Sequence, residues 1–203
     1  MKTKKILLDT LSLTVITLVA VFFLSFVYQM TKQPIADAER EERQKSYRDV
    51  FQTAEKIEPT EREKTERYLP ATKGVHINDV LYAKDKDGKV IGAVASVTSA
   101  NGYGGEIVLS VGIDIAGRVT GVKVTSMSET SGLGAHCTDE GFGDRYIGKT
   151  FAIGIAKDGN GGENDVDAIS SATVTTTAVT EAVNEALRFS RDVLGFREGG
   201  ETK

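Results

Sequence analysis

Residues 105–127, GEIVLSVGIDIAGRVTGVKVTSM, decide the fold that we expect for this chain. Within this stretch, Ile107, Leu109, Val111, Ile113 and Ile115 alternate with Val108, Ser110, Gly112 and Asp114. A period of two predicts a strand that turns one face toward the core. Ala116-Gly117 supplies a turn signal, and Val122 and Val124 continue the apolar positions. The stretch therefore predicts a β-hairpin.

The neighbouring segments extend this β-rich region. VHINDVLYAKD (75–85) and KVIGAVASVTS (89–99) flank the turn signal Asp87-Gly88, which predicts another hairpin. FAIGIAK (151–157) predicts a short strand, and the polar, glycine-rich KDGNGGEND (157–165) predicts a turn.

A long helix is expected from Ala172 to Leu194. Its apolar face comprises Val174, Ala178, Ala182, Val183, Ala186, Leu187 and Leu194, with Glu181, Glu185, Arg188 and Arg191 elsewhere on the helix. The expected order is helix, antiparallel strands, strand and long helix, so the fold class is α+β. Glycine is frequent, at 21 residues, and proline scarce, at 3, which also favours hairpins and loops.

The N-terminal region predicts a membrane anchor. Residues 10–31 carry no charge and, at about 1.5 Å per residue, are long enough to cross a hydrocarbon core of about 30 Å. A cleaved signal peptide is the alternative, but residues 26–30 lack an A-x-A cleavage site. Lys2, Lys4 and Lys5 precede the span and only Lys32 closely follows it, so residues 1–9 are expected to be cytoplasmic and the remainder extracytoplasmic.

Residues 32–70 are expected to connect this anchor to a domain at residues 71–203. From Pro34, a charged stretch with a narrow apolar seam predicts a helical stalk. The following EPTEREKTERYLP (58–70) is almost wholly charged and predicts a solvated linker or a loose helix.

The segment with the clearest chemical implication is DAISSAT (167–173), directly before the long helix. Ser170 or Ser171 is a suitable N-cap, which places Thr173 in the first turn, where free backbone N–H groups favour an anion such as phosphate. An ordinary helix cap is the alternative interpretation.

Two segments resemble the FMN-binding domain family. DAISSATVTT (167–176) resembles its flavinylation motif, Asp-x-x-Ser/Thr-Gly-Ala-Thr, in which the last threonine forms a phosphoester with FMN; that residue is Thr173 here. ETSGLG (129–134) resembles the segment Glu-Thr-Pro-Gly-Leu-Gly of the G subunits of Rnf ion-translocating complexes and the C subunits of sodium-pumping NADH:quinone reductases. Ser171 replaces the usual glycine and Ser131 the usual proline.

The resemblance implies a set of residues near the flavin: Glu129, Thr130, Gly132, Leu133, Gly134, Asp167, Ser170, Ser171 and Ala172. Within this set, Asp167 belongs to the motif that a flavin transferase reads when it moves FMN from FAD in a magnesium-dependent step. Thr175 and Thr176 could donate hydroxyl hydrogen bonds to the phosphate or ribityl oxygens, or could be exposed helix surface.

Other residues are expected to have structural roles. His136-Cys137 lacks a second Cys or His pair, so no metal site is expected, and a single cysteine cannot form an intramolecular disulfide. Tyr103, Phe142 and Tyr146 could stack on an isoalloxazine ring or pack in the core. The formal net charge of −4 does not favour nucleic acid as a partner.

The resemblance implies a covalent-FMN electron carrier in a membrane complex that couples electron transfer between ferredoxin and NAD to movement of Na⁺ or H⁺. Its partners would be the other subunits of an Rnf-type complex, the flavin transferase and membrane lipid, and the chain itself would supply no acid–base catalyst. The alternatives are a C subunit of a quinone reductase, a free-standing extracellular flavoprotein, or an anchored module without a redox role.

Overall fold

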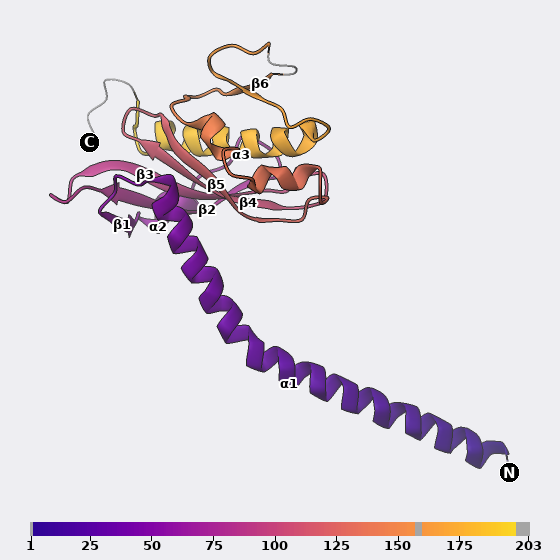
Figure 1. The fold of residues 1–203 in the computed structure, drawn as a ribbon. Coiled ribbons are helices and arrows are strands. Elements are labelled where there is room, and N and C mark those ends of the chain that lie inside the picture. The colour runs from indigo at the N-terminus through magenta and orange to yellow at the C-terminus, as the bar shows by residue number, and fades with distance from the viewer. Residues whose placement is uncertain (1, 157–159, 198–203) are drawn as a thin grey trace. The chain divides into compact units, whose positions relative to one another are not determined.

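The computed structural model describes residues 2–156 and 160–197, which form two compact units, Met1–Glu42 and Arg43–Lys203 (Figure 1). Helix α1, Lys2–Val50, begins in the first unit and ends in the second. From Thr10 it contains a window with a mean hydropathy of 2.4 that is nowhere buried, and by length and composition it can cross a membrane. The long apolar N-terminal helix is thus confirmed, and it continues through Pro34 as one helix.

A five-stranded antiparallel sheet forms the centre of the second unit. Its strands follow chain order: β1 (Lys56–Pro59), β2 (Val75–Lys84), β3 (Val90–Ser99), β4 (Ile107–Asp114) and β5 (Val119–Met127). Both predicted hairpins are confirmed. The first closes around Gly88 and the second around Gly117, each glycine with a positive φ that a side chain would strain.

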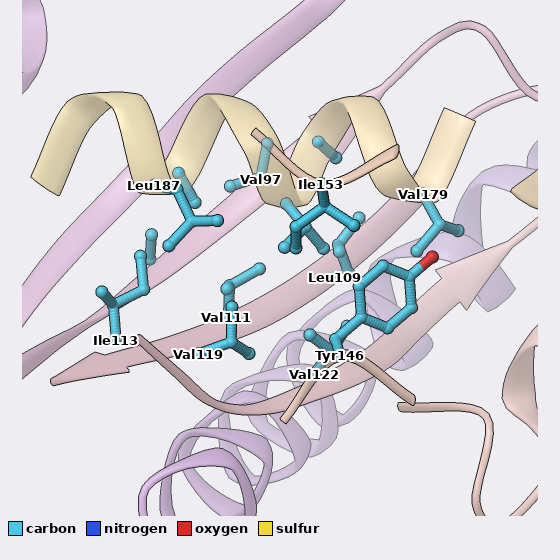
Figure 2. Packing of buried hydrophobic residues seen from close by; sticks show 14 of the residues in the cluster. Val97, Leu109, Val111, Ile113, Val119, Val122, Tyr146, Ile153, Val179 and Leu187 are labelled. Atoms are coloured by element: carbon cyan, nitrogen blue, oxygen red, sulfur yellow. The ribbon is translucent and has the colours of Figure 1, made fainter. Parts of the chain in front are cut away.

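Helix α3, Thr173–Asp192, covers one face of this sheet (Figure 1). Figure 2 shows side chains of the sheet, among them Leu109, Val111 and Ile113, packed beneath Val179 and Leu187 of the helix, all fully buried. Most of the predicted apolar face is confirmed: Ala178, Ala182, Val183, Ala186 and Leu187 are all buried. Two positions were predicted wrongly, because Val174 is 50% exposed and Glu185 only 1%.

The other face of the sheet is also covered, contrary to the expectation of a single core face. The end of α1 packs there with Tyr47, Val50 and Phe51 against Leu81, Ala83 and Val94. Opposite β4, the Ser46 hydroxyl lies 2.9 Å from the Ser110 hydroxyl, and Gly112 is in contact with the Val50 backbone. The small residues of β4 therefore face a helix and not solvent.

The segment expected to be a linker contributes strand β1 and the short helix α2, Arg62–Glu66. Strand β1 was missed because its four residues, KIEP, carry no strand pattern of their own and form a strand only where they pair with β2. After α2, the Tyr68 hydroxyl donates to Glu185 Oε1 over 2.6 Å, and the backbone N–H groups of Ala71 and Thr72 donate to the same carboxylate. These bonds are the reason that Glu185 can be buried.

Between β5 and α3, the described residues form two short 3₁₀ helices, η1 (Gly134–Thr138) and η2 (Gly143–Tyr146), and two short parallel strands, β6 (Gly154–Ala156) and β7 (Asp165–Asp167). The predicted short strand is thus confirmed as β6. Part of the turn expected at residues 157–165 lies outside the described residues.

Candidate functional site

The start of α3 is fixed by a threonine inside the helix. Thr173 lies in the first turn, as predicted, and is the first helical residue, whereas the helix was expected to begin at Ala172. The N-cap is Ala172, so the prediction that Ser170 or Ser171 caps the helix was wrong. Thr176 Oγ1 accepts a hydrogen bond from the Ile169 N–H over 3.0 Å and donates to the Ala172 carbonyl over 3.2 Å. Because Thr176 is fully buried and its hydroxyl is used in this way, it is neither exposed surface nor a donor to a ligand.

Ser171 has a left-handed backbone conformation. Its φ is +64°, and it is the single non-glycine residue with a positive φ among the described residues. An L-residue in this conformation costs roughly 1–2 kcal/mol relative to glycine. The related motif has glycine at this position, and the observed backbone gives the physical reason for it.

The two segments singled out in the sequence line one cavity of about 410 Å³. Its lining residues are Tyr103, Glu129, Thr130, Leu133, Gly134, Ser171, Ala172, Thr173, Val174 and Thr175. The volume falls within the range of small-molecule sites, roughly 300–1,000 Å³. Thr173 is exposed at the helix start, so a hydroxyl group and free backbone N–H groups meet at this cavity.

Glu129 is the most unusual residue of this cavity. Both of its carboxylate oxygens are buried, and neither has a hydrogen-bond partner within the described residues. A Cβ atom added to Gly134 would lie 2.5 Å from Glu129 Oε2 and equally close to Thr175 Oγ1. A Cβ added to Gly102 would lie 2.6 Å from Glu129 Oε1. The two glycines therefore make the space that the carboxylate occupies.

Asp167 and Ser170 lie apart from this group. They line a second cavity, of about 840 Å³, together with His136, Asp139, Glu140, Phe142, Arg145, Lys149, Asp165, Val166, Ala168 and Ile169. Arg145 Nη1 donates to the Asp167 carbonyl over 3.2 Å, and its guanidinium lies 5.4 Å from the centre of the Phe142 ring. The predicted site residues of segment 167–173 are therefore divided between two cavities: Asp167 and Ser170 line the larger one, and Ser171, Ala172 and Thr173 line the smaller one.

The three aromatic candidates have different environments. Tyr103 is 74% exposed beside the smaller cavity, in the glycine-rich loop between β3 and β4, and is free to stack on a ligand. Tyr146 is fully buried, with its hydroxyl 2.9 Å from Thr180 Oγ1, and Phe142 is also buried. The glycines around Tyr103 were the sequence signal for its position. Val174 was missed as a lining residue because helical periodicity assigned it to the core.

The two residues of the His136-Cys137 pair differ in exposure: His136 is exposed and Cys137 is buried. His136 Nδ1 lies 2.7 Å from Asp139 Oδ2, whereas Cys137 is buried. Burial and, after it, the negative charge of Glu129 raise the pKa of the Cys137 thiol to about 11, so the thiol stays protonated at neutral pH. Within the described ranges, no group of three or more His, Cys, Asp or Glu side chains is placed to hold a metal ion.

Comparison with known proteins places both motifs in one family context. Residues 102–188 match the family model described as FMN-binding domain, and residues 1–50 match that described as RnfG N-terminal region. The G subunit of the ion-translocating oxidoreductase complex of Methanosarcina acetivorans is 30% identical over 205 residues, which cover 97% of this chain and 98% of the relative.

Two relatives have more specific names. The G subunit of the Na⁺-translocating ferredoxin:NAD⁺ oxidoreductase complex of Acetobacterium woodii is 31% identical over 53% of each chain. The G subunit of the proton-translocating ferredoxin:NAD⁺ oxidoreductase complex of Clostridium ljungdahlii is 36% identical over 52% of this chain and 57% of the relative.

A solved structure shares the fold. The C subunit of the Na⁺-translocating NADH-quinone reductase of Parabacteroides distasonis superposes with a TM-score of 0.53 at 18% identity, over 76% of this chain and 92% of that one.

Proposed function

Because this chain belongs to the family of G subunits of Rnf ion-translocating oxidoreductase complexes, we propose that it carries FMN covalently on Thr173 and relays electrons at the outer surface of the membrane. The family membership makes it one subunit of a multi-subunit complex with an FMN-binding domain. The phosphoester to Thr173, the orientation in the membrane and the electron route are the parts that we propose.

One observation carries the proposal. Segments 129–134 and 171–175 are distant in the sequence, and both line the 410 Å³ cavity that borders the first turn of α3. An ordinary helix cap would require neither a cavity nor the second segment. An interaction module without a cofactor would likewise leave the buried, unpartnered Glu129 carboxylate without an explanation.

The residues of the cavity fit FMN group by group. The phosphate would lie at the α3 N-terminus, where free N–H groups and the helix dipole stabilise a negative charge. Gly134 allows close approach of the 129–134 segment, and the exposed Tyr103 and Leu133 offer apolar surface to a planar ring. Glu129 offers acceptors for the donor groups of a flavin. Once held there, the flavin supplies the one- and two-electron chemistry of the carrier.

Attachment would be a transfer from FAD by a flavin transferase. An oxygen–phosphorus bond would form between Thr173 Oγ and the FMN phosphate while the pyrophosphate bond of FAD breaks. AMP would leave, and the threonine hydroxyl proton would pass to solvent. The acceptor hydroxyl is accessible, since Thr173 is exposed in the folded domain, as are Asp167 and Ser170 of the same motif. A covalent bond also prevents loss of an exported cofactor by dilution.

The membrane arrangement follows from the N-terminal sequence. The apolar part of α1 would span the membrane among lipid, with Lys2, Lys4 and Lys5 on the cytoplasmic side and the FMN-binding domain outside the cytoplasm. Residues 10–31 contain no ionisable side chain other than Tyr28, so the ion path would lie in other subunits. The complex would couple electron transfer between ferredoxin and NAD to ion movement, as the names of the Acetobacterium and Clostridium relatives state for those proteins.

The test is fluorescence of the denatured chain in a gel after production in a host that contains the flavin transferase. We expect a fluorescent band for the native chain and a dark band for Thr173→Ala. Thr177→Ala is the matched control, because it removes a threonine hydroxyl one turn further along α3 and should leave the band fluorescent. A dark native band beside a fluorescent known substrate of the same transferase would refute covalent attachment.

A further inference from the structure

The Glu129 carboxylate is buried without a partner at the cavity assigned to the flavin. Both oxygens are almost inaccessible to solvent, and neither accepts a hydrogen bond within the described residues. Glycines on two different loops, Gly102 and Gly134, make room for it, since a Cβ on either would come within 2.5–2.6 Å of an oxygen. The two loops therefore pack closely around this carboxylate but provide no hydrogen-bond donor to it.

Such a group is unfavourable in the chain alone. A buried carboxylate without donors loses its hydration on folding and gains no hydrogen bond in exchange, which disfavours the folded chain. Cys137, whose thiol pKa the Glu129 charge helps to raise, offers no positive charge to offset the carboxylate, because the protonated thiol is neutral. A donor from outside the chain would remove the penalty.

The position on the flavin that Glu129 can contact is limited by charge. The FMN phosphate is itself negative and lacks donors, so a carboxylate would be repelled by it. The ribityl hydroxyls and the imide N–H of the ring are the donors that oxidised FMN offers to an acceptor. With the phosphate at Thr173, these donors belong to the part of the molecule that extends into the cavity toward the 129–134 segment.

We infer that Glu129 accepts a hydrogen bond from the ribityl chain or ring of the bound flavin and, through its negative charge, lowers the flavin's reduction potential. This inference rests on the proposed covalent FMN. When the ring gains one electron without a proton, its negative charge increases by one. A carboxylate held close by in a site of low dielectric opposes that change, because like charges repel more strongly there than in water.

The chain offers a matched pair of variants for the test. Glu129→Gln keeps the shape of the side chain and one acceptor but removes the charge. Glu140→Gln makes the same change of net charge at an exposed residue that lines the other cavity. Both would be prepared as the full chain in detergent with covalent flavin, and in-gel fluorescence of each denatured variant would report its flavin content.

A redox titration followed by flavin absorbance should show a more positive midpoint for Glu129→Gln. The expected change is about tenfold in the ratio of reduced to oxidised flavin at a fixed applied potential, or about 59 mV for a one-electron step. Glu140→Gln should shift the midpoint much less. Equal shifts for the two variants, or no shift for Glu129→Gln, would overturn the inference while leaving the covalent carrier intact. A dark native band would instead overturn the proposed function on which the inference rests.

A second measurement separates flavin contact from a purely structural role. In the Thr173→Ala background, which lacks flavin, Glu129→Gln should raise the thermal midpoint, because a neutral amide is less costly to bury than an unpaired carboxylate. In the flavin-loaded chain the same change should give a smaller gain or a loss. Equal destabilisation in both backgrounds would mean that Glu129 supports the fold alone, and would overturn the inference.

Discussion

Replacement of Ser171 by glycine should stabilise the protein. Ser171 has a φ of +64°, a conformation that costs an L-residue roughly 1–2 kcal/mol. Glycine adopts it freely but loses more backbone entropy on folding, which offsets roughly 0.5–1 kcal/mol. The net expectation is a gain of about 0.5–1 kcal/mol, or about 1–4 °C in Tm for a domain of this size.

Scanning calorimetry of the full chain in detergent would measure this, in the Thr173→Ala background so that flavin does not contribute. Ser171→Ala is the first control, since it removes the hydroxyl but keeps the Cβ and should give no gain. Gly88→Ala is the reciprocal control. Gly88 has a φ of +78° and open space around its missing Cβ, so alanine there should cost about 1 kcal/mol through strain alone. A lower Tm for Ser171→Gly, or an equal gain for Ser171→Ala, would refute the argument from backbone strain.

Two further predictions concern buried contacts. Glu185→Gln should lower the free energy of urea unfolding at pH 7 by about 2–3 kcal/mol, since it weakens the charge-assisted bonds from Tyr68, Ala71 and Thr72. Burial acts to raise the pKa of Glu185, but these hydrogen bonds outweigh it and hold the pKa below its usual value. The difference in unfolding free energy between the native chain and Glu185→Gln should therefore be complete above the unfolded pKa of about 4.3. It should disappear as the pH falls through the lower folded pKa, and a difference that grows in acid would contradict this. Gly134→Ala should reduce the flavin absorbance per chain, because its Cβ would lie 2.5 Å from Glu129 Oε2 and Thr175 Oγ1, whereas Gly148→Ala, in open space, should leave the flavin content unchanged.

The parts of the fold that sequence predicted correctly are those determined by local pattern. Strict alternation from Ile107 to Ile113 and the glycines of the two turns define the hairpins without reference to the rest of the chain. Strand β1 could not be found in this way, because its residues form a strand only through pairing with β2, beside the packed end of α1. The second buried face of β4 was missed for a similar reason. Ser110 is a polar residue, and it is buried because Ser46, 64 residues earlier in the sequence, packs against it from α1.

The candidate site shows the same division. The motif placed Thr173 correctly at the start of α3, but the choice of cap depended on a hydroxyl several residues into the helix, Thr176. Glu185 was placed off the apolar face of α3, as suits a residue type that is mostly exposed. Its three donors come from the 68–72 segment, which gave no sequence signal. In both cases the local pattern did not reveal the hydrogen-bond partner of a buried polar side chain.

Two unfavourable local features coincide at the proposed flavin cavity. Ser171 has a strained backbone and Glu129 has a buried carboxylate without donors, and both residues line the same 410 Å³ space. Elsewhere in the domain, the buried carboxylate of Glu185 accepts hydrogen bonds from Tyr68, Ala71 and Thr72, so the chain is able to satisfy such a group when only the fold requires it. Strain and unmet hydrogen bonds persist where the surrounding structure imposes them, and they gather at binding sites. A ligand that brings donors to Glu129 and a phosphate to the first turn of α3 would resolve the electrostatic part of this cost, and the FMN that we propose on Thr173 would do both.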